Sequence, residues 1–71
     1  MSVVRGVEIT SVSSKGFDDA IQQGIARAAK TIGEVRNAWV KEEQMDVEKG
    51  RIVAYTVTMT ITVLLEDTPA Q

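Results

Sequence analysis

The side chains of this 71-residue chain best suited to acid–base chemistry are its ten carboxylates, because it contains no histidine and no cysteine. Histidine is the most common general acid or base, and cysteine is a common nucleophile. The carboxylates are scattered, or lie in predicted strands and turns that water can reach: Glu8, Asp18, Asp19, Glu34, Glu42, Glu43, Asp46, Glu48, Glu66 and Asp67. Glu42 and Glu43 are neighbours in a predicted strand and point to opposite faces, so they do not form an acid–base pair within one subunit. The sequence therefore predicts a protein that is not an enzyme.

Two of these carboxylates, Asp46 and Glu48, are close enough in the sequence to be considered as ligands of a hard cation such as Ca²⁺. Hard cations prefer several oxygen ligands at close spacing, and no EF-hand-like loop surrounds these two residues. Subunits that meet on a symmetry axis can complete a site that one chain cannot show, so a calcium site stays open as an alternative. The absence of cysteine excludes disulfides and thiolate metal sites, and the glycines are too dispersed for a phosphate-binding loop.

Charged residues are spread along the chain, which has eight basic and ten acidic residues and a formal net charge of −2. No basic cluster predicts a nucleic-acid partner, and no apolar run approaches the roughly 20 residues that span a membrane. The first residues do not resemble a signal peptide, so a cytoplasmic location is the default expectation. The length predicts a single domain over residues 1–71, in which residues 66–71 form a flexible tail.

The spacing of apolar residues predicts four elements in the order β-α-β-β. A first strand is expected over residues 3–10 and a helix over residues 14–32. Residues 35–47 and 51–65 are expected to form the second and third strands, joined by a glycine-containing hairpin turn at residues 48–50. This order predicts an α+β fold with one helix packed on a three-stranded antiparallel sheet.

The helix is expected to be amphipathic and to face the sheet with one apolar stripe. The stripe consists of residues at helical spacing: Phe17, Ile21, Ile25, Ala28 and Ile32. Small residues flank it and allow close approach to the sheet: Ala20, Gly24 and Ala29. The hydroxyl groups of Ser13 and Ser14 both suit the N-cap, and Gly33 suits the C-terminal stop.

The third predicted strand shows the clearest alternation in the chain, and its length argues for self-assembly. Its odd-numbered positions are large and apolar, whereas threonines dominate the other face. At about 3.3 Å per residue the strand spans roughly 50 Å, but a helix of about 19 residues covers only about 28 Å. The strand ends and the threonine face, with Ile52, Leu64 and Trp39 beside it, therefore need another cover. A closed homo-oligomer is the usual solution.

Several short motifs follow one another along the chain at a specific spacing. They are Val7-Glu8-Ile9, Ser13 with Gly16, Ala20-Ile21, Gly24-Ile25-Ala26-Arg27-Ala28 with Thr31, Tyr55-x-Val57-x-Met59 and Leu65-Glu66-Asp67. Together with the total length, they resemble the dodecins, small flavin-binding proteins whose β-α-β-β subunits assemble into hollow dodecamers. The resemblance covers nearly the whole chain, residues 3–67, and implies a homododecameric shell.

The resemblance also implies where a ligand would bind, and two of these positions are altered here. A typical dodecin has a tryptophan early in the second strand that stacks on the flavin ring, and Asn37 occupies that position. A typical dodecin also has a glutamine in the third strand that hydrogen-bonds the flavin edge, and Thr56 occupies that position. Trp39, the only tryptophan, lies on the same strand face as Asn37, where it either replaces the stacking residue or fills an interface.

These departures lead to two functional hypotheses. In the first, the chain forms a non-enzymatic dodecamer that binds or stores a small ligand, with riboflavin or FMN as the family ligand and with binding weakened or lost. In the second, the dodecamer is structural or binds a cation such as calcium, and holds no flavin. For family members that lack the tryptophan, the resemblance implies calcium or coenzyme A as alternative ligands.

Overall fold

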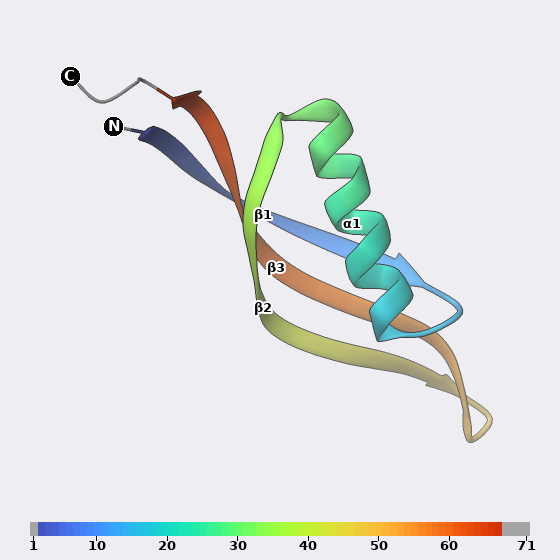
Figure 1. Cartoon of the computed structure of the whole chain (residues 1–71). Helices are drawn as coiled ribbons and strands as arrows, with labels where there is room; N and C mark the ends of the chain where they lie inside the picture. The colour runs from blue at the N-terminus through green and yellow to red at the C-terminus, as the bar shows by residue number, and fades with distance from the viewer. Residues whose placement is uncertain (1, 68–71) are drawn as a thin grey trace.

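Residues 2–67 are described in the computed structural model, which contains three strands and one helix. The elements are β1 (Ser2–Ser13), α1 (Phe17–Thr31), β2 (Glu34–Glu48) and β3 (Arg51–Asp67). Strand β3 lies between β1 and β2, and both pairings are antiparallel. Helix α1 packs against one face of this sheet (Figure 1). The predicted α+β fold, with one helix on a three-stranded antiparallel sheet, is confirmed.

The strands are longer than the sequence predicted, because backbone pairing continues past the residues that alternate in polarity. Strand β1 extends to Ser13, which pairs with Tyr55. Strand β3 continues through Asp67, so residues 66 and 67 belong to the strand and not to the predicted tail. The rest of that tail, residues 68–71, lies outside the described residues.

The helix is shorter than predicted and begins at Phe17. Its N-cap is Gly16, which makes no side-chain capping hydrogen bond. The hydroxyl of Ser13 instead accepts a hydrogen bond from the backbone N–H of Lys15 (2.9 Å) and donates one to the carboxylate of Asp19 (2.6 Å). Ser13 therefore ties the end of β1 to the first turn of α1 without capping the helix. Among the described residues no helix is long and apolar enough to cross a membrane.

Glycines occupy the two turns that require positive φ angles, as the sequence predicted. Gly33 follows the helix with a φ of +152°, and its N–H donates to the carbonyl oxygen of Ala28 (3.3 Å). Between β2 and β3, Lys49 and Gly50 have φ angles of 52° and 77°, as in a two-residue type I′ turn. The chain reversals before and after β2 thus follow from where the glycines are placed.

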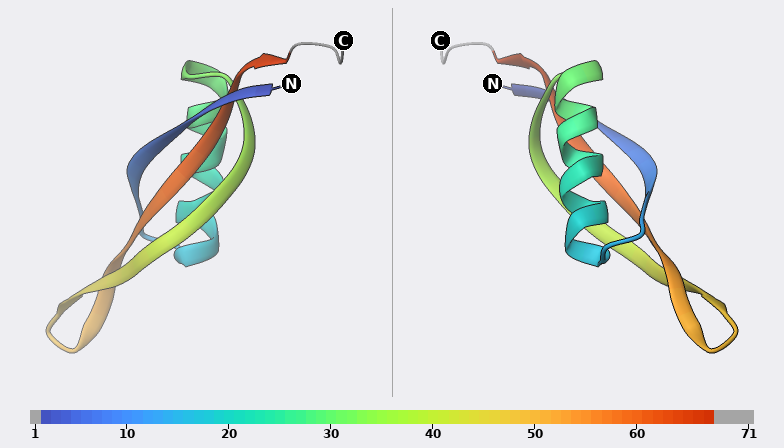
Figure 2. Two further views of the ribbon diagram at one scale, coloured as in Figure 1. Left: turned by 90° about the vertical axis from the view of Figure 1, so that its left-hand side faces the viewer. Right: turned by 90° about the vertical axis from the view of Figure 1, so that its right-hand side faces the viewer.

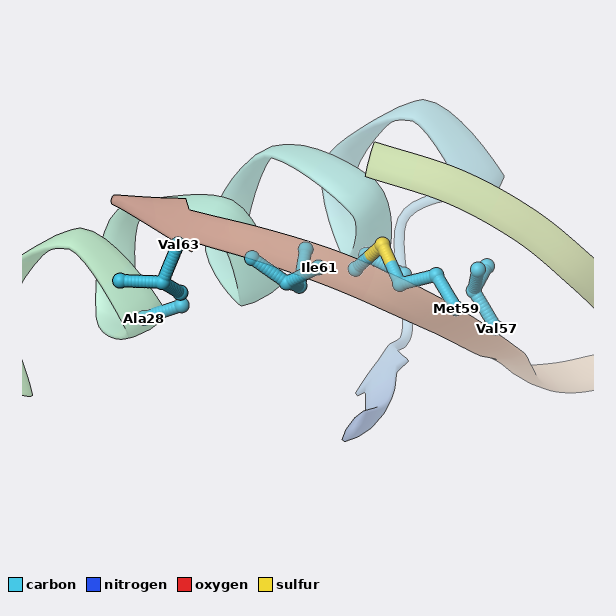
Figure 3. Packing of buried hydrophobic residues seen from close by; sticks show 6 residues of the cluster. Ala28, Val57, Met59, Ile61 and Val63 are labelled. Atoms are coloured by element: carbon cyan, nitrogen blue, oxygen red, sulfur yellow. The ribbon is translucent and has the colours of Figure 1, made fainter. Parts of the chain in front are cut away.

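The hydrophobic core lies between α1 and the central strand β3 (Figure 3). Alternate residues of β3 are completely buried in it: Val57, Met59, Ile61 and Val63. The buried residues of the helix are small and recur every fourth position: Ala20, Gly24 and Ala28. The predicted stripe packs against this core, since Phe17, Ile21 and Ile25 contact it and Ala28 is buried. The small residues predicted to flank the stripe at positions 20 and 24 lie deepest, because small side chains let the helix approach the sheet. Ile21 and Ile25 are only partly buried beside this line, and Ile32 is 39% exposed.

Gly24 is a point of close approach between α1 and the sheet. A Cβ atom added there would lie 2.5 Å from Cε of Met59, 3.2 Å from Cβ of Ser11 and 3.3 Å from Cδ1 of Ile9. The change Gly24→Ala gains about 1 kcal/mol of helix propensity. Met59 is fully buried, however, so overpacking that costs about 1–3 kcal/mol is expected to outweigh this gain. We expect the melting temperature of Gly24→Ala to fall in thermal unfolding.

Two further variants control this experiment. Met59→Leu removes the Cε atom of the closest contact, so combining it with Gly24→Ala should recover part of the lost stability. Gly6→Ala adds the same methyl group in β1, where the nearest atom, Cγ2 of Thr60, lies at an ordinary contact distance of 3.7 Å, and should change the melting temperature little. A higher melting temperature for Gly24→Ala would show that the side chain of Met59 moves to accommodate the added methyl group.

The far end of the β2–β3 hairpin extends beyond both β1 and α1 (Figures 1 and 2). Strand β1 ends opposite Tyr55, so residues 51–54 of β3 have no partner in β1. Large apolar side chains are exposed at this end of the hairpin: Met45 (51%), Val47 (59%), Ile52 (47%) and Val53 (40%). The prediction that one helix does not cover the long third strand is confirmed. We call these four residues the hairpin end.

Candidate functional site

The sheet face opposite α1, here called the open face, carries the three residues predicted to bind a ligand. It is built around the threonines of β3, whose positions alternate with the buried residues: Thr56, Thr58, Thr60 and Thr62. Trp39 pairs with Thr60 and Asn37 pairs with Thr62, and cross-strand partners share a face. Both residues therefore lie on the open face, as predicted. Trp39 is 68% exposed, more than any other large apolar side chain in the described part of the chain.

One chain does not bring the three predicted ligand residues together. Thr56 pairs with Gln44 of β2, whereas Asn37 pairs with Thr62, six residues further along β3. At about 3.3 Å per residue, this separates Asn37 from Thr56 by roughly 20 Å along the strand. A small ligand that touches both positions must therefore contact two subunits.

Trp39 lies beside an ion pair that crosses the open face. Glu8 of β1 pairs with Thr60 from the other side, so Glu8, Thr60 and Trp39 form one row across the three strands. Lys41 sits at a β-bulge of β2, and its Nζ lies 3.4 Å from Oε2 of Glu8. The ion pair thus joins the two edge strands over β3. Sequence reasoning missed it because the two residues are 33 positions apart and no local pattern aligns them.

The remaining charged groups of the open face are acidic on balance. Arg36 sits at another β-bulge, and its Nη1 lies 3.6 Å from Oε2 of Glu34. Glu42 and Asp46 pair with β3 residues of the threonine face, and neither is in a salt bridge within the described residues. Among the side chains that the structure describes, the carboxylates of this face are Glu8, Glu34, Glu42 and Asp46. Two cations against these four carboxylates leave the open face negative.

The carboxylates singled out as an acid–base pair or as cation ligands can be followed in the structure. Glu42 and Glu43 pair with β3 residues on opposite faces, as predicted. Asp46 and Glu48 were the candidate cation ligands. Between residues 2 and 67 no group of three or more histidine, cysteine, aspartate or glutamate residues is arranged to hold a metal ion.

A cavity of about 320 Å³ lies at the β1 edge of the sheet, between α1 and β1. Its walls include Ile9 and Val12 of β1, together with Gln23, Arg27 and Thr31 of α1. None of the three predicted ligand residues lines it. The sequence carried no signal for this cavity, because its shape depends on how α1 crosses β1.

Comparison with protein families gives a match to the dodecin family over residues 3–66. Among solved structures, a dodecin from Streptomyces davaonensis is 30% identical with a TM-score of 0.86, and the match covers 93% of this chain and 97% of that chain. A protein from Thermus thermophilus is 31% identical with a TM-score of 0.86, and the match covers 96% of this chain and 100% of that chain. The comparison with curated proteins gave no match.

A more distant solved structure is described as a calcium-chelating antigen, a calcium dodecin from Mycobacterium tuberculosis. It is 22% identical with a TM-score of 0.77, and the match covers 99% of this chain and 100% of that chain. At this identity the likeness shows the fold alone. The family match spans nearly all described residues, and the two structures at 30% and 31% identity share the fold over almost their full lengths. The chain therefore belongs to the dodecin family.

Proposed function

We propose that this chain is a non-enzymatic subunit of a homo-oligomer that binds a small planar ligand at a surface shared between subunits. The observation that carries the proposal is the position of Trp39, 68% exposed on a sheet face that α1 does not cover. Aromatic side chains stack on flat ligands and are enriched at subunit interfaces. The distance between Asn37 and Thr56 supports a site built from two subunits, and membership of the dodecin family supports the same arrangement.

The proposed assembly is a dodecamer. A 71-residue chain buries only about 60% of the surface that its unfolded form exposes, so partner subunits are expected to add stability. The hairpin end offers four large apolar side chains to such a partner. Complete burial of such a side chain contributes about 1.5–3 kcal/mol, and between 40% and 59% of each one is left for a partner to cover. Assembly is therefore expected to supply a large part of the stability of the fold.

The proposed ligand is flavin-like, but bound more weakly than in a dodecin with a tryptophan at position 37 and a glutamine at position 56. Asn37 provides no aromatic plane, and the side chain of Thr56 is shorter than an amide. Trp39 supplies an aromatic plane one row away along the sheet. Storage or buffering of the ligand is the proposed role, and no catalytic group takes part in it.

Native mass spectrometry of freshly purified protein tests the assembly and the ligand in one measurement. We expect a particle of twelve chains of 7.7 kDa each, with sub-stoichiometric bound mass or none. A folded monomer of 7.7 kDa at micromolar concentration would rule out the proposed oligomer. A trimer would fit the uncovered hairpin end but would contradict the dodecamer.

The visible absorption spectrum separates the two functional hypotheses. Protein that is yellow after purification, or becomes yellow with added flavin, supports the ligand-binding function. Colourless protein whose assembly depends on divalent ions would favour the structural or calcium-binding alternative.

A further inference from the structure

We infer that the open face prefers a planar aromatic ligand without an anionic group, and that Glu8 sets this preference by engaging the ammonium group of Lys41. The inference rests on the proposed function, because it concerns the ligand of the same aromatic site at Trp39. It adds the charge class of that ligand and names the residue that determines it.

Lys41 is the cation best placed to hold an anionic group on a ligand at Trp39. Its side chain crosses β3 and donates to Glu8, which lies in the same row of the sheet as Trp39. A phosphate is held by cationic donors that are free to form charge-assisted hydrogen bonds. Because the Glu8 carboxylate lies 3.4 Å from Nζ of Lys41, a phosphate would have to share this ammonium group with a carboxylate of the same sign of charge.

Arg36, the second cation described on the open face, is also paired with a carboxylate. A guanidinium nitrogen of Arg36 lies 3.6 Å from a carboxylate oxygen of Glu34, two residues away on the same strand. Glu42 and Asp46 add negative charge that no salt bridge among the described residues compensates. A surface of one sign repels ligands of the same sign, and its repetition in an oligomer strengthens the field. A ring without an anionic group avoids this repulsion and keeps the stacking contact.

The exposure of the Lys41–Glu8 ion pair limits how strongly it can change ligand affinity. The side chains of Lys41 and Glu8 are 45% and 56% exposed, so water and salt screen their charges. We therefore expect an uncharged ligand to bind about three- to tenfold more tightly than its phosphorylated form at low ionic strength, and the ratio to shrink with added salt.

Riboflavin and FMN are suitable probes, because they share one ring system and differ by a phosphate. The chain has a single tryptophan, so quenching of its fluorescence reports binding at Trp39. Both probes are titrated against the assembled wild type and the Glu8→Gln variant. Glu8→Gln releases Lys41 and removes one carboxylate, so FMN affinity should rise about five- to tenfold while riboflavin affinity stays within about twofold.

Glu43→Gln is the matched control. It makes the same change of charge on β2, the strand that carries Lys41, but Glu43 pairs with Val57 and so lies on the opposite face of the sheet. Its ratio of FMN to riboflavin affinity should stay within about twofold of that of the wild type. Native mass spectrometry verifies that each variant keeps the wild-type stoichiometry.

The outcomes separate the inference from the function on which it rests. Equal or tighter binding of FMN by the wild type, or a ratio that Glu8→Gln leaves unchanged, overturns the charge preference and leaves the aromatic site standing. An equal effect of Glu43→Gln overturns the role of Glu8. If neither probe quenches Trp39, the proposed aromatic site fails, and the charge preference with it.

Discussion

Replacing Ile52 with aspartate is expected to abolish the oligomer and the folded state together. Ile52 belongs to the hairpin end and is 47% exposed in the single chain, where it pairs with Val47. A neighbour that covers this end would bury an unpaired carboxylate against apolar surface, which costs several kcal/mol in each subunit. The lost burial of the isoleucine adds about 1.5–3 kcal/mol. Native mass spectrometry and thermal unfolding measure both losses.

Two further variants serve as a second test of the interface and as a control for the added charge. Leu64→Asp places a carboxylate at the other end of the open face, opposite Glu34, and should also disrupt assembly. Gln22→Asp adds the same charge on an exposed helix position without removing apolar surface, and should change stability by no more than about 0.5 kcal/mol. If Ile52→Asp stays assembled with an unchanged melting temperature, the hairpin end is not an interface.

The combined change Asn37→Trp and Thr56→Gln is expected to strengthen riboflavin binding by roughly two to four decades. Aromatic stacking contributes about 0.5–1.5 kcal/mol beyond area burial, and burial of the ring contributes about 1.5–3 kcal/mol. A hydrogen bond to a neutral group adds about 0.5–1.5 kcal/mol. Thr62, the partner of Asn37, lies six residues from Thr56 along β3, so the two changed side chains can act on one ligand only across subunits. The gain should therefore be lost when the oligomer dissociates.

The variant Trp39→Ala tests whether Trp39, and not a residue at position 37, stacks on the ligand. Quenching of riboflavin fluorescence is compared for the wild type, Trp39→Ala and the combined variant. Weak binding by the wild type that the combined variant strengthens would support the view that Asn37 and Thr56 weaken the site. Tight quenching by the wild type that vanishes in Trp39→Ala would show instead that the stacking residue has moved by two positions.

The order of the elements and the two faces of β3 could be predicted from the sequence, because both depend on local patterns. Period-two alternation identified the buried residues from Val57 to Val63 and the threonines between them. It also placed Asn37 and Trp39 on one face. Gly33 and Gly50 marked the turns, because the backbone needs a positive φ there. The mismatch between a long strand and one helix likewise predicted the exposed hairpin end.

Three features at the helix and the site were decided by the tertiary structure alone. The helix meets the sheet along its smallest side chains. The sequence did not predict this line of contact, because the close approach at Gly24 depends on Met59, which is far away in the sequence. The β-bulge at Lys41 breaks the alternation of β2, so Glu42 lies on the open face together with Trp39. The contact between Lys41 and Glu8 depends on how two edge strands align on β3. The sequence by itself determines periodicity and turns, whereas register, bulges and closest approach depend on contacts between distant segments.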